Sequence, residues 1–244
     1  MQAYSMWVRA MLDVPERTIM ERIFVWAGGA IFVASLSLTA WWYAVRFGQD
    51  RPLTGWTALA IDALLLTVFA MHHSLFARAS TKAWLASLIP ARLLRSVYVW
   101  FASALLMVVD LFWQPVGATL YNVGGWSAWL LTGVQIAGVG LIAKSVQAID
   151  PLELAGIRNP KMSNEELQTG GVYRLVRHPL YFGWVLIVFG AAHMTGDRLA
   201  FAILTTTYLV IAMPWEERLL EREFGVAYRD YKQHVRWRIV PYVY

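Results

Sequence analysis

The chain has 244 residues, of which 58% are hydrophobic and 15% are charged, and its formal net charge is +5. Soluble globular domains carry about 25% charged residues, so this composition indicates an integral membrane protein. Because the chain contains no Cys, disulfides, thiolate nucleophiles and cysteine metal sites are excluded. The length suits one membrane domain over residues 1-244 and little else.

Six apolar runs are candidate membrane spans, since about 20 apolar residues cross the hydrocarbon layer. In chain order they are roughly Ile23 to Val45, Trp56 to Ala77, Val97 to Trp113, Trp126 to Ala143, Pro179 to Thr195 and Leu199 to Trp215. The last two are short and only Gly196-Asp197-Arg198 separates them, which predicts a helical hairpin that tilts or only partly spans. We therefore expect an all-α protein, a bundle of about six transmembrane helices. Residues 1-149 would hold the first four, and residues 150-244 the connector, hairpin and tail.

The Lys and Arg residues are distributed very unequally between the two faces of this arrangement. The N-terminus, the loop from Phe76 to Arg95, the connector from Lys144 to Arg177 and the tail after Trp215 hold 18 of the 21. The positive-inside rule then places both termini in the cytoplasm, and we expect a bacterial-type inner membrane. Topology and anionic membrane lipids account for the net positive charge. We expect no nucleic-acid partner and infer no obligate protein partner.

Within the spans, glycines indicate close helix contacts, and ionisable residues are candidates for function. Gly28-Gly29 in the first span and Gly133, Gly138 and Gly140 in the fourth predict tight helix contacts. In the second span, Asp62 and His72-His73 are candidate functional groups, because ionisable side chains in a membrane usually face an interior or a wet cavity. The alternative for the histidines is an interfacial position with bonds to water or backbone. Adjacent residues point about 100° apart on a helix, so no two-histidine metal site is expected. An interfacial position is favoured for Asp110.

The segment Arg177-His178-Pro179-Leu180-Tyr181 opens the C-terminal hairpin. Proline pushes His178 out of helical geometry and suits the first position of the following helix. At such a helix mouth the free N–H groups favour an anionic ligand group, and Arg177 adds a charge suited to a carboxylate or phosphate. The chain reversal returns Glu216-Glu217 to the same membrane face. We therefore expect Arg177, His178, Tyr181 and Glu216 to share a cytoplasmic cofactor pocket, with the long polar connector from Asp150 to Arg177 as a lid or binding loop.

These residues carry a resemblance to a known family. Tyr173, Arg177-His178-Pro179, Tyr181 and Gly183, then Glu216-Glu217, Phe224-Gly225, Tyr228, Tyr231 and Pro241, resemble the membrane methyltransferase superfamily of isoprenylcysteine carboxyl and phospholipid methyltransferases. Upstream, His73-Ser74, Phe76-Ala77-Arg78, Pro90, Arg95-Ser96, Tyr98 and Asp150 to Gly156 resemble the branch of methanethiol S-methyltransferase and NnrU-type proteins.

The resemblance implies S-adenosylmethionine as methyl donor. Carried over by position, the donor site comprises Leu167, Gln168, Tyr173, His178, Pro179, Leu180, Tyr181 and Glu216, to which the charge of Arg177 is added. The residue chemistry agrees for several of them. A carboxylate suits Arg177 or His178 at a helix start, and an ammonium or ribose suits Glu216. A sulfonium suits the aromatic faces of Tyr173 and Tyr181.

The acceptor is expected to be a small or lipophilic thiol such as methanethiol, giving dimethyl sulfide. The isoprenylcysteine enzymes have an Arg four residues before the Glu that matches Glu216, whereas this chain has Ala212. Because a thiol reacts as its thiolate, His73 is the candidate catalytic residue for removing the proton or placing the acceptor. A structural histidine is the rival interpretation of His73. Isoprenylcysteine carboxyl or phospholipid N-methylation remains an alternative, as does a non-enzymatic NnrU-type protein that binds haem through His72 or His73.

Overall fold

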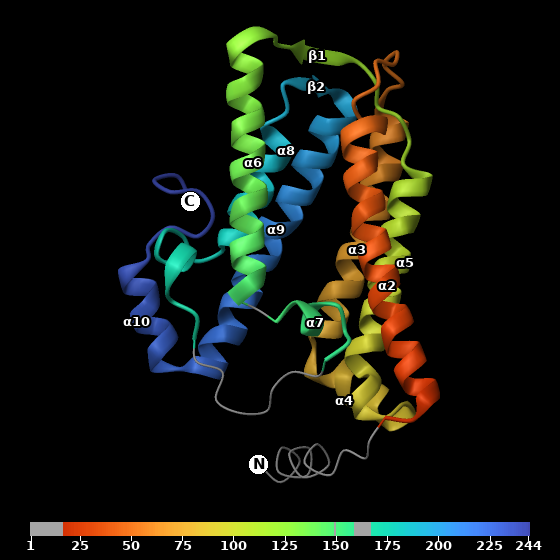
Figure 1. The fold of residues 1–244 in the computed structure, drawn as a ribbon, viewed down its shortest axis with the longest axis vertical. Coiled ribbons are helices and arrows are strands. Elements are labelled where there is room, and N and C mark those ends of the chain that lie inside the picture. Colours follow the sequence, from red (N-terminus) through yellow and green to blue (C-terminus); the bar gives the residue numbers. More distant parts are fainter. Residues whose placement is uncertain (1–16, 149, 159–166) are drawn as a thin grey trace. The chain divides into compact units, whose positions relative to one another are not determined.

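The computed structural model describes residues 17–148, 150–158 and 167–244 (Figure 1). Within these ranges, five helices are long and apolar enough to cross a membrane. They are α2 (Ile19–Trp41), α3 (Trp56–Ala77), α5 (Leu94–Phe112), α6 (Gly125–Ala148) and α9 (Gly196–Phe224). A π-helical turn, Trp42–Arg46, extends α2. The prediction of an all-α integral membrane protein is confirmed, and the bounds predicted for the second span are those of α3.

The shorter helices are α4 (Ala79–Leu88), α7 (Pro151–Leu154), α8 (Pro179–Phe189) and α10 (Val226–His234), with 3-10 turns at Ala91–Leu93 and Gly171–Arg174. The fifth predicted span corresponds to α8, which has only 11 residues. At a rise of about 1.5 Å per residue it is roughly 16 Å long, about half the thickness of the hydrocarbon layer. The predicted end of this span at Thr195 is therefore wrong.

A two-stranded antiparallel sheet follows α8 and was not predicted. Strand β2 (His193–Thr195) pairs with β1 (Thr119–Asn122), which lies in the uncharged loop before α6. Strands of three and four residues are too short to show an alternating pattern, and their pairing depends on a partner more than 70 residues away in the chain.

The described chain divides into two compact units. The first takes in residues 17–40, 67–112 and 151–158. Here Gly28 lies against the ring of Trp100, whose Nε1 donates to the Phe24 carbonyl at 3.1 Å, and Gly29 lies against Ile157. The close contact predicted for these glycines is confirmed. Asp110, for which an interfacial position was favoured, is fully buried in the protein and accepts a 2.7 Å hydrogen bond from Thr39.

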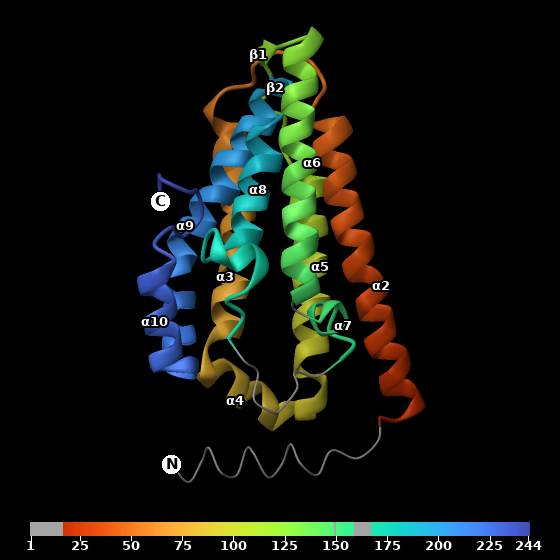
Figure 2. The same ribbon diagram turned by 60° about the vertical axis from the view of Figure 1, so that its left-hand side comes forward.

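The second unit takes in residues 41–66, 113–148, 150 and 167–244. In this unit α6 runs alongside α8, as both views show (Figures 1 and 2). A Cβ atom on Gly183 would lie 2.7 Å from the carbonyl oxygen of Gly138, and the reverse holds for Gly138. Gln135 also donates to the Ile187 carbonyl at 2.8 Å. The predicted tight contact is confirmed for Gly138, which joins α6 to the helix that carries the Arg-His-Pro segment. It is wrong for Gly133 and Gly140, because a Cβ atom on either would meet nothing within 4 Å among the described residues.

A buried carboxylate, Asp197, holds the N-terminal end of α9 in place. Gly196-Asp197-Arg198, expected to be a turn, forms the first turn of α9, and Thr195 caps it by accepting from the Arg198 amide. Asp197 is buried and accepts hydrogen bonds from Trp113 Nε1 and from the amides of Val116 and Gly117 at 2.8, 3.0 and 3.1 Å. A buried carboxylate with three donors is well satisfied, so the N-terminus of α9 is firmly attached to the loop after α5.

Candidate active site

The start of α8 has the geometry that its proline predicts. His178 has φ −121° and ψ 68°, outside the helical region, and Pro179 is the first helical residue. The backbone before it pairs with the end of the chain. The amide of Arg177 donates to the Trp237 carbonyl at 2.9 Å, and the amide of His178 donates to the Arg238 carbonyl at 2.8 Å. The segment after α10 thus determines where Arg177 and His178 lie.

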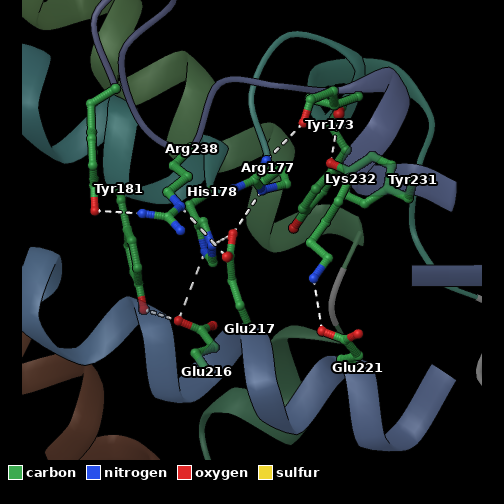
Figure 3. A network of polar contacts seen from close by, with 12 residues as sticks. Tyr173, Arg177, His178, Tyr181, Glu216, Glu217, Glu221, Tyr231, Lys232 and Arg238 are labelled. Carbon is green, nitrogen blue, oxygen red and sulfur yellow. Dashed lines mark hydrogen bonds and ion pairs between the residues drawn. The ribbon is translucent and has the colours of Figure 1, made fainter. Parts of the chain in front are cut away.

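Glu217 is the centre of a buried network of charges (Figure 3). Its Oε1 accepts from Arg177 Nε at 2.7 Å and lies 3.4 Å from His178 Nε2, and its Oε2 lies 3.5 Å from Arg238 Nε. The side chains of Glu217 and Arg177 are only 9% and 8% exposed. Arg177 also donates through one terminal nitrogen to the carbonyls of Val235 and Arg236, at 3.0 Å each. Its guanidinium is therefore already engaged within the protein.

Glu216 lies on the neighbouring face of α9, with its side chain 44% exposed. It accepts a 2.6 Å hydrogen bond from the Tyr181 hydroxyl and lies 3.8 Å from His178 Nδ1. The rings of His178 and Tyr181 are stacked, with centroids 5.2 Å apart and planes 7° apart. The first turn of α8 and the returning acidic pair thus meet, and the open carboxylate of Glu216 lies beside a flat pair of rings (Figure 3).

An aromatic layer from α10 underlies the network. Tyr228, Tyr231 and Val235 are buried and pack with Leu167 and Tyr173, and the Tyr231 hydroxyl donates to the Tyr173 carbonyl at 2.7 Å. Burial raises the pKa of Tyr228, and the negative charge of Glu217 adds to that effect. The Tyr228 hydroxyl is buried and has no partner within the described residues. A neutral hydroxyl with an unused hydrogen bond therefore lies among these side chains.

The predicted donor-site residues are all placed in the second unit. The structure brings together His178, Tyr181 and Glu216, whereas Leu167 packs into the aromatic layer and Gln168 is exposed. Pro179 is buried and Leu180 is half-buried. Connector residues 159–166, expected to help form the lid, lie outside the described residues. A hollow of about 280 Å³ lies nearby, where Arg174, Leu175, Arg236, Trp237 and Tyr242 contribute to its wall, and none of the predicted residues lines it.

His73, the candidate catalytic residue, belongs to the first unit. Its Nδ1 lies 3.1 Å from the Phe69 carbonyl, one turn earlier on α3. Because a carbonyl can only accept, Nδ1 carries the hydrogen in this bond, and Nε2 is left as a proton acceptor. The ring lies in an aromatic cluster with Phe69, His72 and Tyr98. This arrangement suits either a base or a packed structural histidine.

Sequence reasoning missed two residues of the network. Glu217 was noted only as the neighbour of Glu216, yet it contacts both Arg177 and His178. Its position in the acidic pair was the feature of the sequence that could have indicated this role. Arg238 carried no signal, since its place beside Glu217 depends on the backbone pairing of the chain's end with residues 177 and 178.

Comparison with known proteins identifies the family. Residues 128–227 match the phospholipid methyltransferase family. The chain is 35% identical to methanethiol S-methyltransferase 2 of Bradyrhizobium diazoefficiens, over 73% of this chain and 71% of that protein. It is 36% identical to the methanethiol S-methyltransferase of Crocosphaera subtropica, over 77% and 76% of the two chains.

A further relative is nurim of Xenopus laevis, at 32% identity over 74% of this chain and 73% of that protein. No solved structure matches the chain significantly. The matched family segment includes the Arg-His-Pro start of α8, the stacked rings and the acidic pair of α9. The resemblance predicted from these residues is confirmed, and the chain belongs to the phospholipid methyltransferase family of integral membrane proteins.

Proposed function

We propose that this protein transfers a methyl group from S-adenosylmethionine to a small thiol, with methanethiol as acceptor and dimethyl sulfide as product. The relatives named methanethiol S-methyltransferase support the reaction, since they share about a third of their residues with most of this chain. The observation that carries the proposal is the meeting of His178, Tyr181 and Glu216 at the start of α8.

The residues fit the donor on chemical grounds. The carboxylate of Glu216 is partly open and can accept from an ammonium or a ribose hydroxyl. The stacked rings of His178 and Tyr181 offer an aromatic face to a cation. The first amides of α8 have no acceptor within the helix and suit a carboxylate. The unused hydroxyl of Tyr228 is a further polar group that the protein leaves without a partner.

Arg177 is bonded to Glu217 and to two carbonyls, so we infer that it orders the acidic pair and the helix start. Its contact with the donor stays a prediction. Glu216 remains the acid that is open to a ligand. Leu167, Gln168, Tyr173, Pro179 and Leu180 complete the proposed donor site by position.

When bound, S-adenosylmethionine would supply an electrophilic methyl group on a sulfonium. The chain's own residues must hold the acceptor in line, exclude water and take the thiol proton, since the thiolate is the nucleophile. His73 has its Nε2 lone pair available for that proton. Ala212, where isoprenylcysteine enzymes have an Arg, supplies no positive charge four residues before Glu216 for a substrate carboxylate, which favours a small thiol over a prenylcysteine.

The proposal also includes orientation and organisation. The 18 of 21 Lys and Arg residues on one face support cytoplasmic termini in an inner membrane, with the donor site on the cytoplasmic side. The chain would work as one membrane domain, in which residues 150-244 provide most of the donor site and His73 is the catalytic residue.

The test measures methyl transfer and donor binding separately in detergent-purified protein. Dimethyl sulfide is quantified by gas chromatography after incubation with S-adenosylmethionine and methanethiol, and donor affinity is measured by calorimetry. We expect Glu216→Gln to weaken donor binding and His73→Gln to leave binding intact while lowering the rate of product formation. Glu223→Gln, an exposed acid on the same helix, is the matched control and should change neither.

Parallel reactions with a prenylcysteine and with phosphatidylethanolamine decide between acceptors. Transfer to either of these in place of methanethiol would contradict the thiol assignment while retaining the donor. Purified, folded protein that binds no S-adenosylmethionine and methylates none of the three would refute the proposal. A haem absorption band lost on replacing His72 or His73 would instead favour the haem-binding alternative.

A further inference from the structure

The hollow of about 280 Å³ lies in the second unit, between the segment before α8 and the segment after α10. Arg174 and Leu175 contribute to its wall, and α8 begins four residues after Leu175. Its other side comes from the segment after α10, including Arg236 and Trp237. Because the Arg177 amide donates to the Trp237 carbonyl, this segment is bonded to the start of α8. In both ribbon views the end of the chain turns back from α10 toward α8 (Figures 1 and 2).

The wall of the hollow is positively charged. Arg174 and Arg236 are both exposed, and their guanidinium groups have no ion-pair or hydrogen-bond partner in the part of the chain that the structure describes. His234 lies beside them and donates from Nδ1 to the Asp230 carbonyl at 2.8 Å, so its Nε2 is directed elsewhere. None of the eight lining residues is acidic. Two unpaired guanidinium groups in a concave surface suit a phosphate, which Arg binds in bidentate fashion.

Apolar and aromatic side chains border the same hollow. The ring centroids of Trp237 and Tyr242 are 5.5 Å apart, and Tyr242 and Leu175 are 86% and 49% exposed. Trp and Tyr are enriched where a membrane meets water, and basic residues beside them attract anionic lipids. Exposed apolar side chains are unfavourable in water, and the guanidinium groups beside them have no protein anion. One lipid molecule can contact both, with its acyl chain on the apolar side chains and its phosphate on the guanidinium groups.

We propose that this hollow binds the headgroup phosphate of an anionic phospholipid, with its glycerol and upper acyl chain against Leu175, Trp237 and Tyr242. The lipid would be a structural ligand that attaches the C-terminal segment to the cytoplasmic leaflet. Given the thiol acceptor proposed above, it is separate from the methyl acceptor, since a phosphate diester offers no thiol to methylate. Lipid binding itself does not depend on that reaction.

The experiment counts bound lipid on the full chain by native mass spectrometry in detergent, with dioleoylphosphatidylglycerol and dioleoylphosphatidylcholine as probes. We expect the wild type to prefer phosphatidylglycerol. The double variant Arg174→Gln/Arg236→Gln should bind it about 30-fold more weakly, because each cation near a membrane surface contributes about a factor of five. Arg218→Gln/Arg222→Gln removes the same charge from exposed positions of α9 and should bind almost as the wild type does.

Three outcomes would overturn the inference. Equal loss in both double variants would mean that general surface charge attracts the lipid. Inorganic phosphate displacing phosphatidylglycerol at an equal concentration would mean that the hollow takes free anions. Displacement by S-adenosylhomocysteine would make the hollow part of the donor site. Melting curves of all variants establish that each is folded, and donor binding measured on the same samples keeps this result distinct from the proposed methyl transfer.

Discussion

Replacing Glu217 with Gln tests whether the buried network holds the candidate site together. The substitution keeps the size of the side chain and one acceptor oxygen, but it removes the charge that faces Arg177, His178 and Arg238 at 2.7, 3.4 and 3.5 Å. Arg177, only 8% exposed, would lose its counter-charge while keeping its two backbone carbonyl acceptors.

The cost follows from these contacts. Removing one partner of a buried ion pair costs about 3–5 kcal/mol, and a hydrogen bond to a charged group is worth about 1.5–3 kcal/mol. The Gln oxygen still accepts from Arg177, and Arg177 keeps its two carbonyl acceptors. We therefore expect the free energy of unfolding to fall by about 3 kcal/mol, the value at which the two ranges meet. For a chain of this size that is a fall of roughly 6–12 °C in Tm.

The assay is thermal unfolding of purified protein in detergent, followed by intrinsic fluorescence. Glu221→Gln is the matched control, because Glu221 lies one turn further along α9 and pairs with Lys232 in a more exposed position. A solvent-screened pair should give a much smaller change. The double variant Arg177→Gln/Glu217→Gln should be less destabilised than the sum of the single variants. Equal melting shifts for Glu217→Gln and Glu221→Gln would refute the network as the stabilising element.

Three further predictions concern other parts of the second unit. Gly183→Leu should lower the Tm by the equivalent of about 1–3 kcal/mol, because its Cβ would lie 2.7 Å from the Gly138 carbonyl oxygen. Gly133→Ala is the control and should leave the Tm unchanged, because its Cβ meets open space within the described residues. Asp197→Asn places an amide against three donors and should cost about 1.5–3 kcal/mol, with exposed Asp230→Asn as control in the same melts. The hydrogen bond from Thr119 lowers the pKa of Asp50, so its stabilisation is complete above the ordinary carboxyl pKa and is lost as the pH falls through the lowered value. The Tm values of Thr119→Val and wild type should therefore differ at neutral pH and converge in acid, once the pH has fallen through the lowered pKa of Asp50; a constant difference would contradict this reasoning.

The helices could be predicted because their physical basis is local. Length and apolar composition determine a membrane span, and the bounds of α3 follow from the run between Trp56 and Ala77. The start of α8 could also be predicted. Pro179 restricts the backbone of the residue before it, and its missing amide hydrogen is not needed at the first position of a helix. Gly138 indicated a small helix face, although only the structure shows that it meets Gly183.

What could not be predicted depends on pairings between distant residues. The strands Thr119–Asn122 and His193–Thr195 exist because each finds the other. Arg238 reaches Glu217 because the chain's end pairs with residues 177 and 178. The sequence also did not show which of the two acids would be buried. A helix directs Glu216 and Glu217 about 100° apart, and either one could have faced inward.

Pro214 gives α9 a bend point two residues before Glu216. The helix is 29 residues long, roughly 43 Å, and Asp197 fastens its first turn to the loop after α5. Pro214 has no amide hydrogen for the carbonyl of Val210, so the helical ladder is interrupted there. Beside the acidic pair, the helix is therefore held less by its own backbone hydrogen bonds, and the contacts of Glu217 with Arg177 and Arg238 replace part of that support.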